Sequence, residues 1–81
     1  MDEKDILERI RAFVDEEREL RARHEHESPS DAEEHRRLKE LEVALDQCWD
    51  LLRQRRARVQ AGQNPDDAQV RPASQVENYR Q

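Results

Sequence analysis

Three groups of side chains in this sequence have the chemistry to form a site, and the first is a set of histidines. His24, His26 and His35 lie close together along the chain, with glutamates among them. Imidazole and carboxylate groups near one turn are ligands for zinc or another divalent ion. His24 and His26 are two residues apart, however, so they point to different sides of a helix. A metal site is therefore a weak alternative, and histidines exposed to solvent are the default expectation.

The second candidate is Cys48, the single cysteine of the chain. A cysteine nucleophile needs a histidine base and an accessible pocket, and neither neighbouring helical turn holds a histidine. A small buried apolar residue is the better interpretation. The single glycine excludes a glycine-rich phosphate loop, and the sequence has no CxxC, HExxH or catalytic-triad motif. We therefore expect no enzymatic activity and no cofactor.

The third candidate is a run of arginines without an acid, made up of Arg53, Arg55, Arg56 and Arg58. Such a run can contact phosphates or an acidic protein patch. The structural interpretation is stronger, because cations favour a helix C-terminus and the acidic start of the chain is expected beside them. The net charge is −5 and no long stretch is basic, which disfavours general nucleic-acid binding.

Two long helices are the elements that must position these groups. Apolar side chains recur every three or four residues, first at Ile6, Ile10, Phe13 and Leu20, and then at Leu38, Leu41, Leu45, Cys48 and Leu52. Between them, Ser28-Pro29-Ser30-Asp31 offers capping residues, and Gly62 supplies a stop. The pattern predicts an all-α chain with a helix over about 3–26, a turn at 27–29 and a helix over about 30–61.

The connection is too short for parallel helices, so we expect an antiparallel two-helix hairpin with coiled-coil-like packing. The two apolar stripes align when the numbers of facing residues sum to 58. This register places Ile6 opposite Leu52 and Glu3 opposite Arg55. The expected hairpin core consists of Ile6, Ile10, Phe13, Leu20, Leu41 and Cys48.

A lone hairpin is thin support for a chain this small, which has 15 Leu, Ile, Val and Phe among 81 residues. The apolar arc of the second helix spans about 160°, whereas an ordinary amphipathic stripe spans about 100°. We therefore expect two hairpins to dimerise into a four-helix bundle. The expected contact residues are Trp49, Leu51, Leu52, Leu45 and Leu38. The alternatives are that the C-terminal tail, or another protein, covers the extra apolar surface.

Residues 62–81 form this tail, and their composition changes to prolines and small polar residues. Asn64-Pro65-Asp66-Asp67 is typical of a helix start, and Ser74 with Glu77 has capping-box spacing for a last short turn. Two alternatives stay open with equal weight. Either Val70, Val76 and Tyr79 anchor a partly ordered tail on the hairpin, or the tail is frayed, as chain termini often are.

The stretch LEVALDQCWDLLRQRRAR at 41–58 resembles a known family, the small uncharacterised actinobacterial proteins filed as domain of unknown function 2630. The opening Asp5-Ile6-Leu7 and the ending Val76-Glu77-Asn78-Tyr79 are also similar to that family. The resemblance covers nearly the whole chain. It implies a helical bacterial protein of this length, and it implies no activity, cofactor or partner.

These observations favour a non-enzymatic helical module that interacts with a second copy of itself, or with an unidentified cytosolic protein. One alternative is a small regulator that docks on the transcription or translation machinery, or on RNA, through Arg53–Arg58. Another is a metal-binding protein that uses the histidines. A lone cysteine and an acidic N-terminus without signal-peptide features predict a cytoplasmic location, and no apolar run is long enough to enter a membrane.

Overall fold

The computed structural model describes residues 1–26 and 32–76, except for the side chains of 24–26. Within these residues the chain is helical and has no strand. The elements are the helices α1 (Glu3–His26) and α2 (Ala32–Gln60), the 3₁₀ turn η1 (Pro65–Asp67) and the short helix α3 (Ala73–Val76). The prediction of an all-helical chain with two long helices is confirmed. The helix α2 ends one residue earlier than expected, and the expected turn at 27–29 and the expected start of this helix at about 30 lie outside the described residues.

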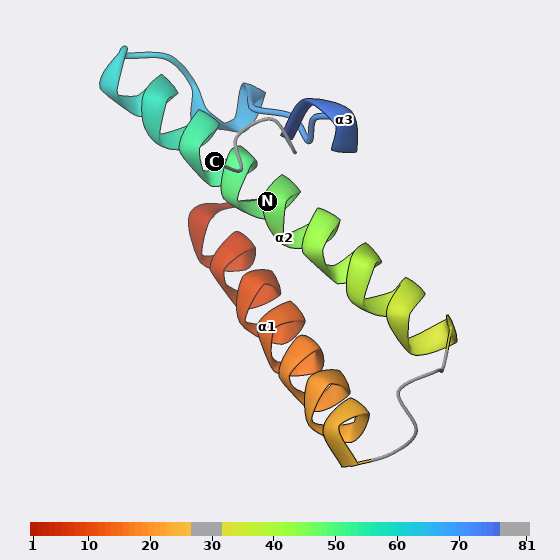
Figure 1. Cartoon of the computed structure of the whole chain (residues 1–81). Coiled ribbons are helices and arrows are strands. Elements are labelled where there is room, and N and C mark those ends of the chain that lie inside the picture. The colour runs from red at the N-terminus through yellow and green to blue at the C-terminus, as the bar shows by residue number, and fades with distance from the viewer. Residues whose placement is uncertain (27–31, 77–81) are drawn as a thin grey trace.

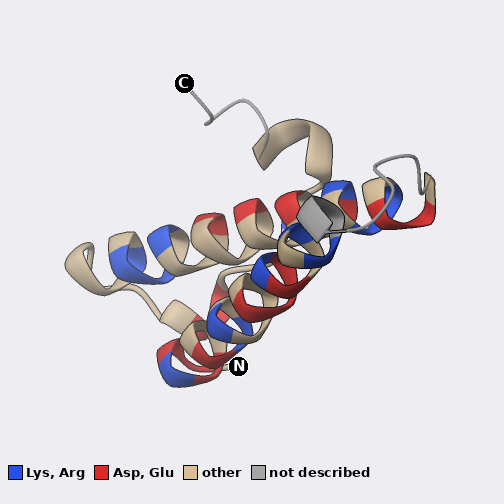
Figure 2. Ribbon diagram, turned by 60° about the horizontal axis from the view of Figure 1, so that its bottom comes forward, with Lys and Arg blue, Asp and Glu red and all other residues tan. Residues whose placement is uncertain are grey.

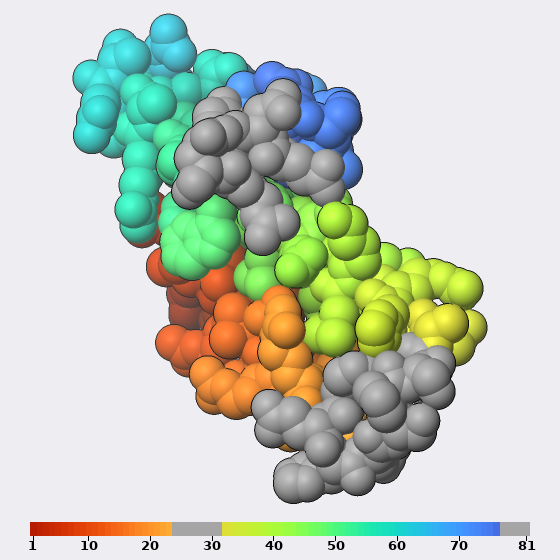
Figure 3. All heavy atoms as spheres, in the orientation of Figure 1, coloured from red at the N-terminus to blue at the C-terminus, as the bar shows by residue number. Residues whose placement is uncertain are grey.

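The helix α2 is the central element, with α1 on one side of it and the segment after Gly62 on the other (Figure 1). The helix α1 runs along it in the opposite direction, and the segment after Gly62 turns back and follows its other side. The space-filling view shows the same order, with the red and orange helix α1 and the blue tail on either side of the green part of α2 (Figure 3). Both η1 and α3 pack against α2.

The apolar core lies between the first half of α1 and the second half of α2. Ile6, Ile10, Leu51 and Leu52 form one buried cluster, and Val14, Leu45, Cys48 and Ala68 pack against it. Leu20 and Leu41 are also buried. Of the residues expected in the hairpin core, Phe13 and Cys48 are only half-buried. Complete burial of a side chain such as Ile6 stabilises the fold by about 1.5–3 kcal/mol relative to leaving it exposed.

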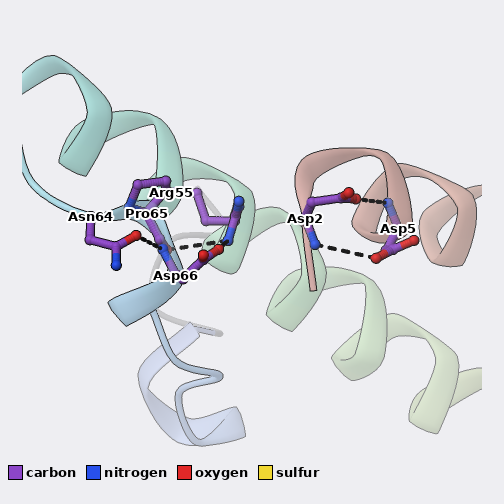
Figure 4. Close-up of polar contacts among 6 residues, drawn as sticks. All are labelled: Asp2, Asp5, Arg55, Asn64, Pro65 and Asp66. Atoms are coloured by element: carbon purple, nitrogen blue, oxygen red, sulfur yellow. Dashed lines mark hydrogen bonds and ion pairs between the residues drawn. The ribbon is translucent and has the colours of Figure 1, made fainter.

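Two aspartates cap the start of α1 (Figure 4). The backbone N–H of Asp5 donates to Asp2 Oδ1 at 2.9 Å, and the backbone N–H of Asp2 donates to Asp5 Oδ2 at 3.3 Å. This is a reciprocal capping box in which aspartate replaces the usual glutamate. The hydrogen bond from the Asp5 backbone lowers the pKa of Asp2. The exchange satisfies backbone donors that the first helical turn leaves without partners.

Gly62 ends α2 in a left-handed conformation, with φ at +74°. The N–H of Gln63 donates to the carbonyl of Arg58 at 2.7 Å, and the N–H of Gly62 donates to the carbonyl of Val59 at 3.1 Å. This pair of bonds is a Schellman motif. A Cβ at Gly62 would meet nothing within 4 Å, so the backbone angle, and not space, favours glycine here.

Charged residues of both signs occur along both long helices (Figure 2). Two ion pairs cross the hairpin on its opposite sides. Glu3 pairs with Arg56 at 3.2 Å, and Glu16 pairs with Arg37 at 2.6 Å. Arg55, which the expected register places opposite Glu3, lines one groove with Glu3 and Arg56 and pairs with Asp66 at 2.9 Å. The hairpin pattern does not include this carboxylate, which η1 supplies.

Candidate functional site

A buried ion pair joins the tail to α2. The side chain of Asp50 is fully buried, and the guanidinium of Arg71 donates to both of its carboxylate oxygens, with the Nε–Oδ2 bond at 2.8 Å. Asp50 precedes Leu52 by two residues, so it projects about 160° away from the α1 side of the helix. The tail therefore covers a face of α2 that the hairpin leaves open.

Two glutamines of α2 hold the tail on either side of this pair. Gln47 Nε2 donates to the carbonyl of Arg71 at 3.2 Å, and Gln54 Nε2 donates to the carbonyl of Gln69 at 2.8 Å. The Gln54 amide also donates to Asp50 Oδ2 at 2.9 Å. The two glutamines are seven residues apart, or about two helical turns, so they share one face with Asp50 between them. We call Gln47, Asp50 and Gln54 the clamp.

Arg71 and Gln54 keep the buried carboxyl of Asp50 ionised. Burial by itself raises the pKa of this carboxyl, but hydrogen bonds from Arg71 and Gln54, with the charges of Arg71 and Arg53, hold the pKa of Asp50 below its ordinary value. The carboxylate is therefore charged at neutral pH, although water does not reach it. Its negative charge is balanced within the protein by a residue of the tail.

As far as residue 76, the tail is ordered and packed on the hairpin, which is the first of the two alternatives, and it is not frayed. Val76 is 1% exposed and anchors α3. Asn64 caps η1 by accepting a hydrogen bond from the N–H of Asp66 at 3.0 Å, although the turn ends at Asp67 and is shorter than the helix start suggested. Val70, an expected anchor, is exposed. The third expected anchor, Tyr79, lies outside the described residues.

A second feature is an apolar flank of the hairpin. Leu7 follows Glu3 by four residues and Trp49 precedes Arg56 by seven, so each lies on the same side of its helix as its charged neighbour. Because Glu3 pairs with Arg56, Leu7 and Trp49 project from one side of the hairpin. They are 41% and 42% exposed. The same helical spacing adds further apolar residues, and we call the set the Trp49 flank: Leu7, Val14, Leu38, Leu45 and Trp49.

Two of the five expected contact residues are not on this flank. Leu51 is 7% exposed and Leu52 is 1% exposed, and both belong to the core of the single chain. Leu52 faces Ile6 and Ile10 in the buried cluster, whereas Leu51 lies on the opposite side of α2 from Trp49. The wide apolar arc of α2 is thus divided, and Trp49, with the half-buried Leu45 and Leu38, is the part left at the surface.

Cys48 lies in a shallow groove on the side opposite the Trp49 flank. The groove has a volume of about 110 Å³, and its lining includes Arg9, Phe13, Cys48, Leu51 and Val70. Burial raises the pKa of the Cys48 thiol, against a smaller opposite effect of the Arg9 charge. A raised pKa keeps the sulfur protonated and weakens it as a nucleophile, which fits the packing role expected from the sequence.

The arginine run is largely bound to the protein's own acceptors. Arg55 donates to Asp66 and to the carbonyl of Pro65, as Figure 4 shows. Arg56 donates to Glu3 at 3.2 Å, and Arg58 donates to the Gln63 side chain at 3.4 Å. Arg53 is exposed, and its charge acts on Asp50. Arg55 therefore joins α2 to η1, Arg56 joins α2 to α1, and Arg58 contacts the turn after α2.

The histidine prediction falls mostly outside the described side chains. His24 and His26 lie in the last turn of α1, where no side chain is described, and His35 is exposed in the first turns of α2. Among the described side chains, no three His, Cys, Asp or Glu residues come together as metal ligands would. No helix within the described ranges is long and apolar enough to cross a membrane.

Comparison with known proteins gives one family. Its profile, described as "Protein of unknown function (DUF2630)", matches residues 2–81. The chain belongs to this family. An uncharacterized protein of Mycobacterium tuberculosis and another of Mycobacterium bovis are each 52% identical to it over 77 residues, covering 95% of this chain and 88% of the relative. No solved structure gives a significant match.

The clamp was not found by the sequence reasoning. The sequence pattern places Asp50 on the solvent face of an amphipathic helix, where an aspartate needs no partner. The only signal lay in the tail, where Arg71 stands immediately before Pro72 and five residues before the apolar Val76. A residue before proline is restricted to extended conformations, so this segment is predisposed to lie flat along a helix.

Proposed function

We propose that this protein is a non-enzymatic helical interaction module that binds a second copy of itself through the Trp49 flank. Two hairpins packed by these flanks form a four-helix bundle. The exposure of Trp49 carries the proposal. A tryptophan buries up to about 250 Å² when it is fully covered, so its 42% exposed fraction leaves about 100 Å² available.

Covering this area is worth about 2.5 kcal/mol for each Trp49 at about 25 cal/mol per Å². Tryptophan is also enriched among residues that dominate binding energy. The flank has charges at its edge, since Glu3 and Arg56 pair beside it and Arg21 pairs with Glu17 at 3.4 Å. An apolar centre with a charged rim is the common arrangement of a protein interface.

The placement of the arginines favours this proposal over docking on RNA. Arg55, Arg56 and Arg58 donate to acceptors within the chain, so a phosphate would have to compete there with Asp66, Glu3 or Gln63. The single cysteine of the chain agrees with action in a reducing cytoplasm, where disulfides are rare.

The test is the molar mass in solution, measured by light scattering or sedimentation equilibrium at tens of micromolar. We expect a dimer, and we expect Trp49→Ala to weaken it about fifty- to a hundredfold for each copy of the side chain lost, as about 2.5 kcal/mol implies. Val70→Ala is the matched control, because Val70 is 58% exposed but lies on the opposite side. A monomeric wild-type protein, or equal weakening by both changes, contradicts the proposal.

A further inference from the structure

The clamp binds a peptide segment through two kinds of contact, hydrogen bonds to its backbone and an ion pair with its arginine side chain. Gln47 and Gln54 bond the backbone carbonyls of Arg71 and Gln69, which every chain offers, so they hold an extended segment without regard to its side chains. Asp50 adds selectivity, because a buried carboxylate accepts the two parallel bonds of a guanidinium and is left uncompensated if a side chain without a positive charge is present. These are the properties of a recognition site, and its occupant here is the chain's own tail.

The contacts of the clamp do not depend on which copy supplies the tail. Because η1 follows the turn, it moves with the tail, and the segment from Pro65 to Val76 would make the same hydrogen bonds, ion pairs and apolar contact on the α2 helix of another molecule, including the bonds of Arg55 to η1. The closed and exchanged arrangements differ at the turn after α2, where Gly62 holds its left-handed φ of +74°. A short hinge with identical contacts on either side of it is the condition under which elements exchange between protomers.

We propose that the clamp on α2 is a recognition site for an extended arginine-proline segment, and that opening of the turn at 61–64 allows the tail of a second copy to occupy it. In the exchanged dimer each molecule supplies Arg71 to the other's Asp50. This interface is separate from the Trp49 flank, since Asp50 and Trp49 are on different sides of α2, and it does not require the proposed function to be correct.

Two charge reversals test the exchange with full-length chains. Asp50→Arg places two guanidinium groups together in its own clamp, and Arg71→Asp places two carboxylates together, so neither chain can dock its tail on itself. When the two variants are refolded together from urea, each clamp finds a matching tail only on the other chain. We expect a heterodimer by native mass spectrometry. Its dissociation constant should be at least about a hundredfold lower than that of a dimer of either variant alone, because both buried pairs are restored.

The double variant Asp50→Arg with Arg71→Asp in one chain is the control, and slow hydrogen exchange at the Val76 amide reports tail docking. If the double variant docks its tail while the mixture behaves as the sum of its two components, exchange between copies is refuted. If the double variant does not dock its tail, substitutions of Gly62 in the turn at 61–64 test the exchange instead. Gly62→Ala penalises the left-handed turn and Gly62→Asn tolerates it, so we expect roughly fivefold or more dimer from the alanine variant when both chains also carry Trp49→Ala, which removes dimers through the flank. Equal dimer from both refutes the proposal.

These outcomes are distinct from those of the Trp49 flank. Both charge variants keep Trp49, so a dimer through the flank forms equally in the separate and mixed samples, and only the gain on mixing reports exchange. Conversely, Trp49→Ala removes the flank and leaves the clamp intact. The two interfaces therefore succeed or fail independently.

Discussion

Removing the guanidinium of Arg71 should release the tail. Asp50 is fully buried beneath the docked tail, and Arg71→Ala removes the two bonds from the guanidinium and leaves the bond from Gln54. Breaking a buried pair by deleting one partner costs about 3–5 kcal/mol. The chain can avoid this cost by letting water reach Asp50, which means detaching the tail.

Detachment also has a cost that can be worked from the contacts. It exposes Val76, which is worth about 1.5–3 kcal/mol when buried, and it breaks the two bonds from Gln47 and Gln54 to tail carbonyls, worth about 1 kcal/mol each. The freed residues regain conformational entropy, which offsets part of this loss. Detachment is therefore the cheaper response, and the free energy of unfolding should fall by about 3 kcal/mol.

Urea unfolding followed by circular dichroism measures that fall, and hydrogen exchange at the Val76 amide reports the tail. Arg56→Ala is the matched control, because Arg56 and Glu3 are 58% and 49% exposed and such surface pairs contribute under about 1 kcal/mol. The double variant Asp50→Ala with Arg71→Ala should be more stable than Arg71→Ala alone, since no charge remains buried. The reasoning fails if Arg71→Ala costs no more than Arg56→Ala, or if Val76 keeps its protection.

Three further predictions concern pH, the core and the thiol. Because the pKa of Asp50 is lowered in the folded chain, the unfolded chain binds more protons in acid. Protection of the Val76 amide from hydrogen exchange should therefore be constant near neutrality and be lost below an ordinary aspartate pKa of about 3.9, as pH falls through the lowered value. A loss already at pH 6 would contradict this assignment. Ile6→Ala should lower the free energy of unfolding by about 2–5 kcal/mol, whereas Leu7→Ala, at a 41% exposed position, should lower it by under about 1 kcal/mol; similar losses would remove Ile6 from the core. Cys48, whose pKa is raised by burial, should react with a thiol reagent at neutral pH more slowly than the urea-unfolded chain does, and equal rates would contradict its burial.

The two long helices were predictable because their signal is local and repeated. Each apolar stripe returns every three or four residues over several turns, so Ile6 and Ile10, or Leu41 and Leu52, indicate both the helix and its buried face. The register was less certain at its ends. Arg56, and not Arg55, pairs with Glu3 because Arg55 is drawn to Asp66 of η1. A pattern restricted to two helices cannot include that competition.

The tail-binding face was not predictable for a different physical reason. Asp50 is buried by residues about twenty positions away along the chain, in a segment with little helical periodicity of its own. Leu51 and Leu52 were expected in an interface because the apolar arc of α2 is wider than one partner helix covers, and coverage by the tail was the alternative. The structure has α2 between two partners, α1 and the tail, so part of that surface is already covered.

The dimensions of the molecule bear on how its assembly can be measured. Its extents are 51 × 24 × 18 Å and its radius of gyration is 15.1 Å, whereas a compact chain of 81 residues has about 12 Å. Such a rod elutes early from a sizing column, and a monomer would pass for a heavier globular protein. Two rods joined along the Trp49 flank gain width while their length stays nearly the same. Dimerisation through this flank should therefore lower the frictional ratio in sedimentation velocity as the mass doubles, and an end-to-end contact would raise it.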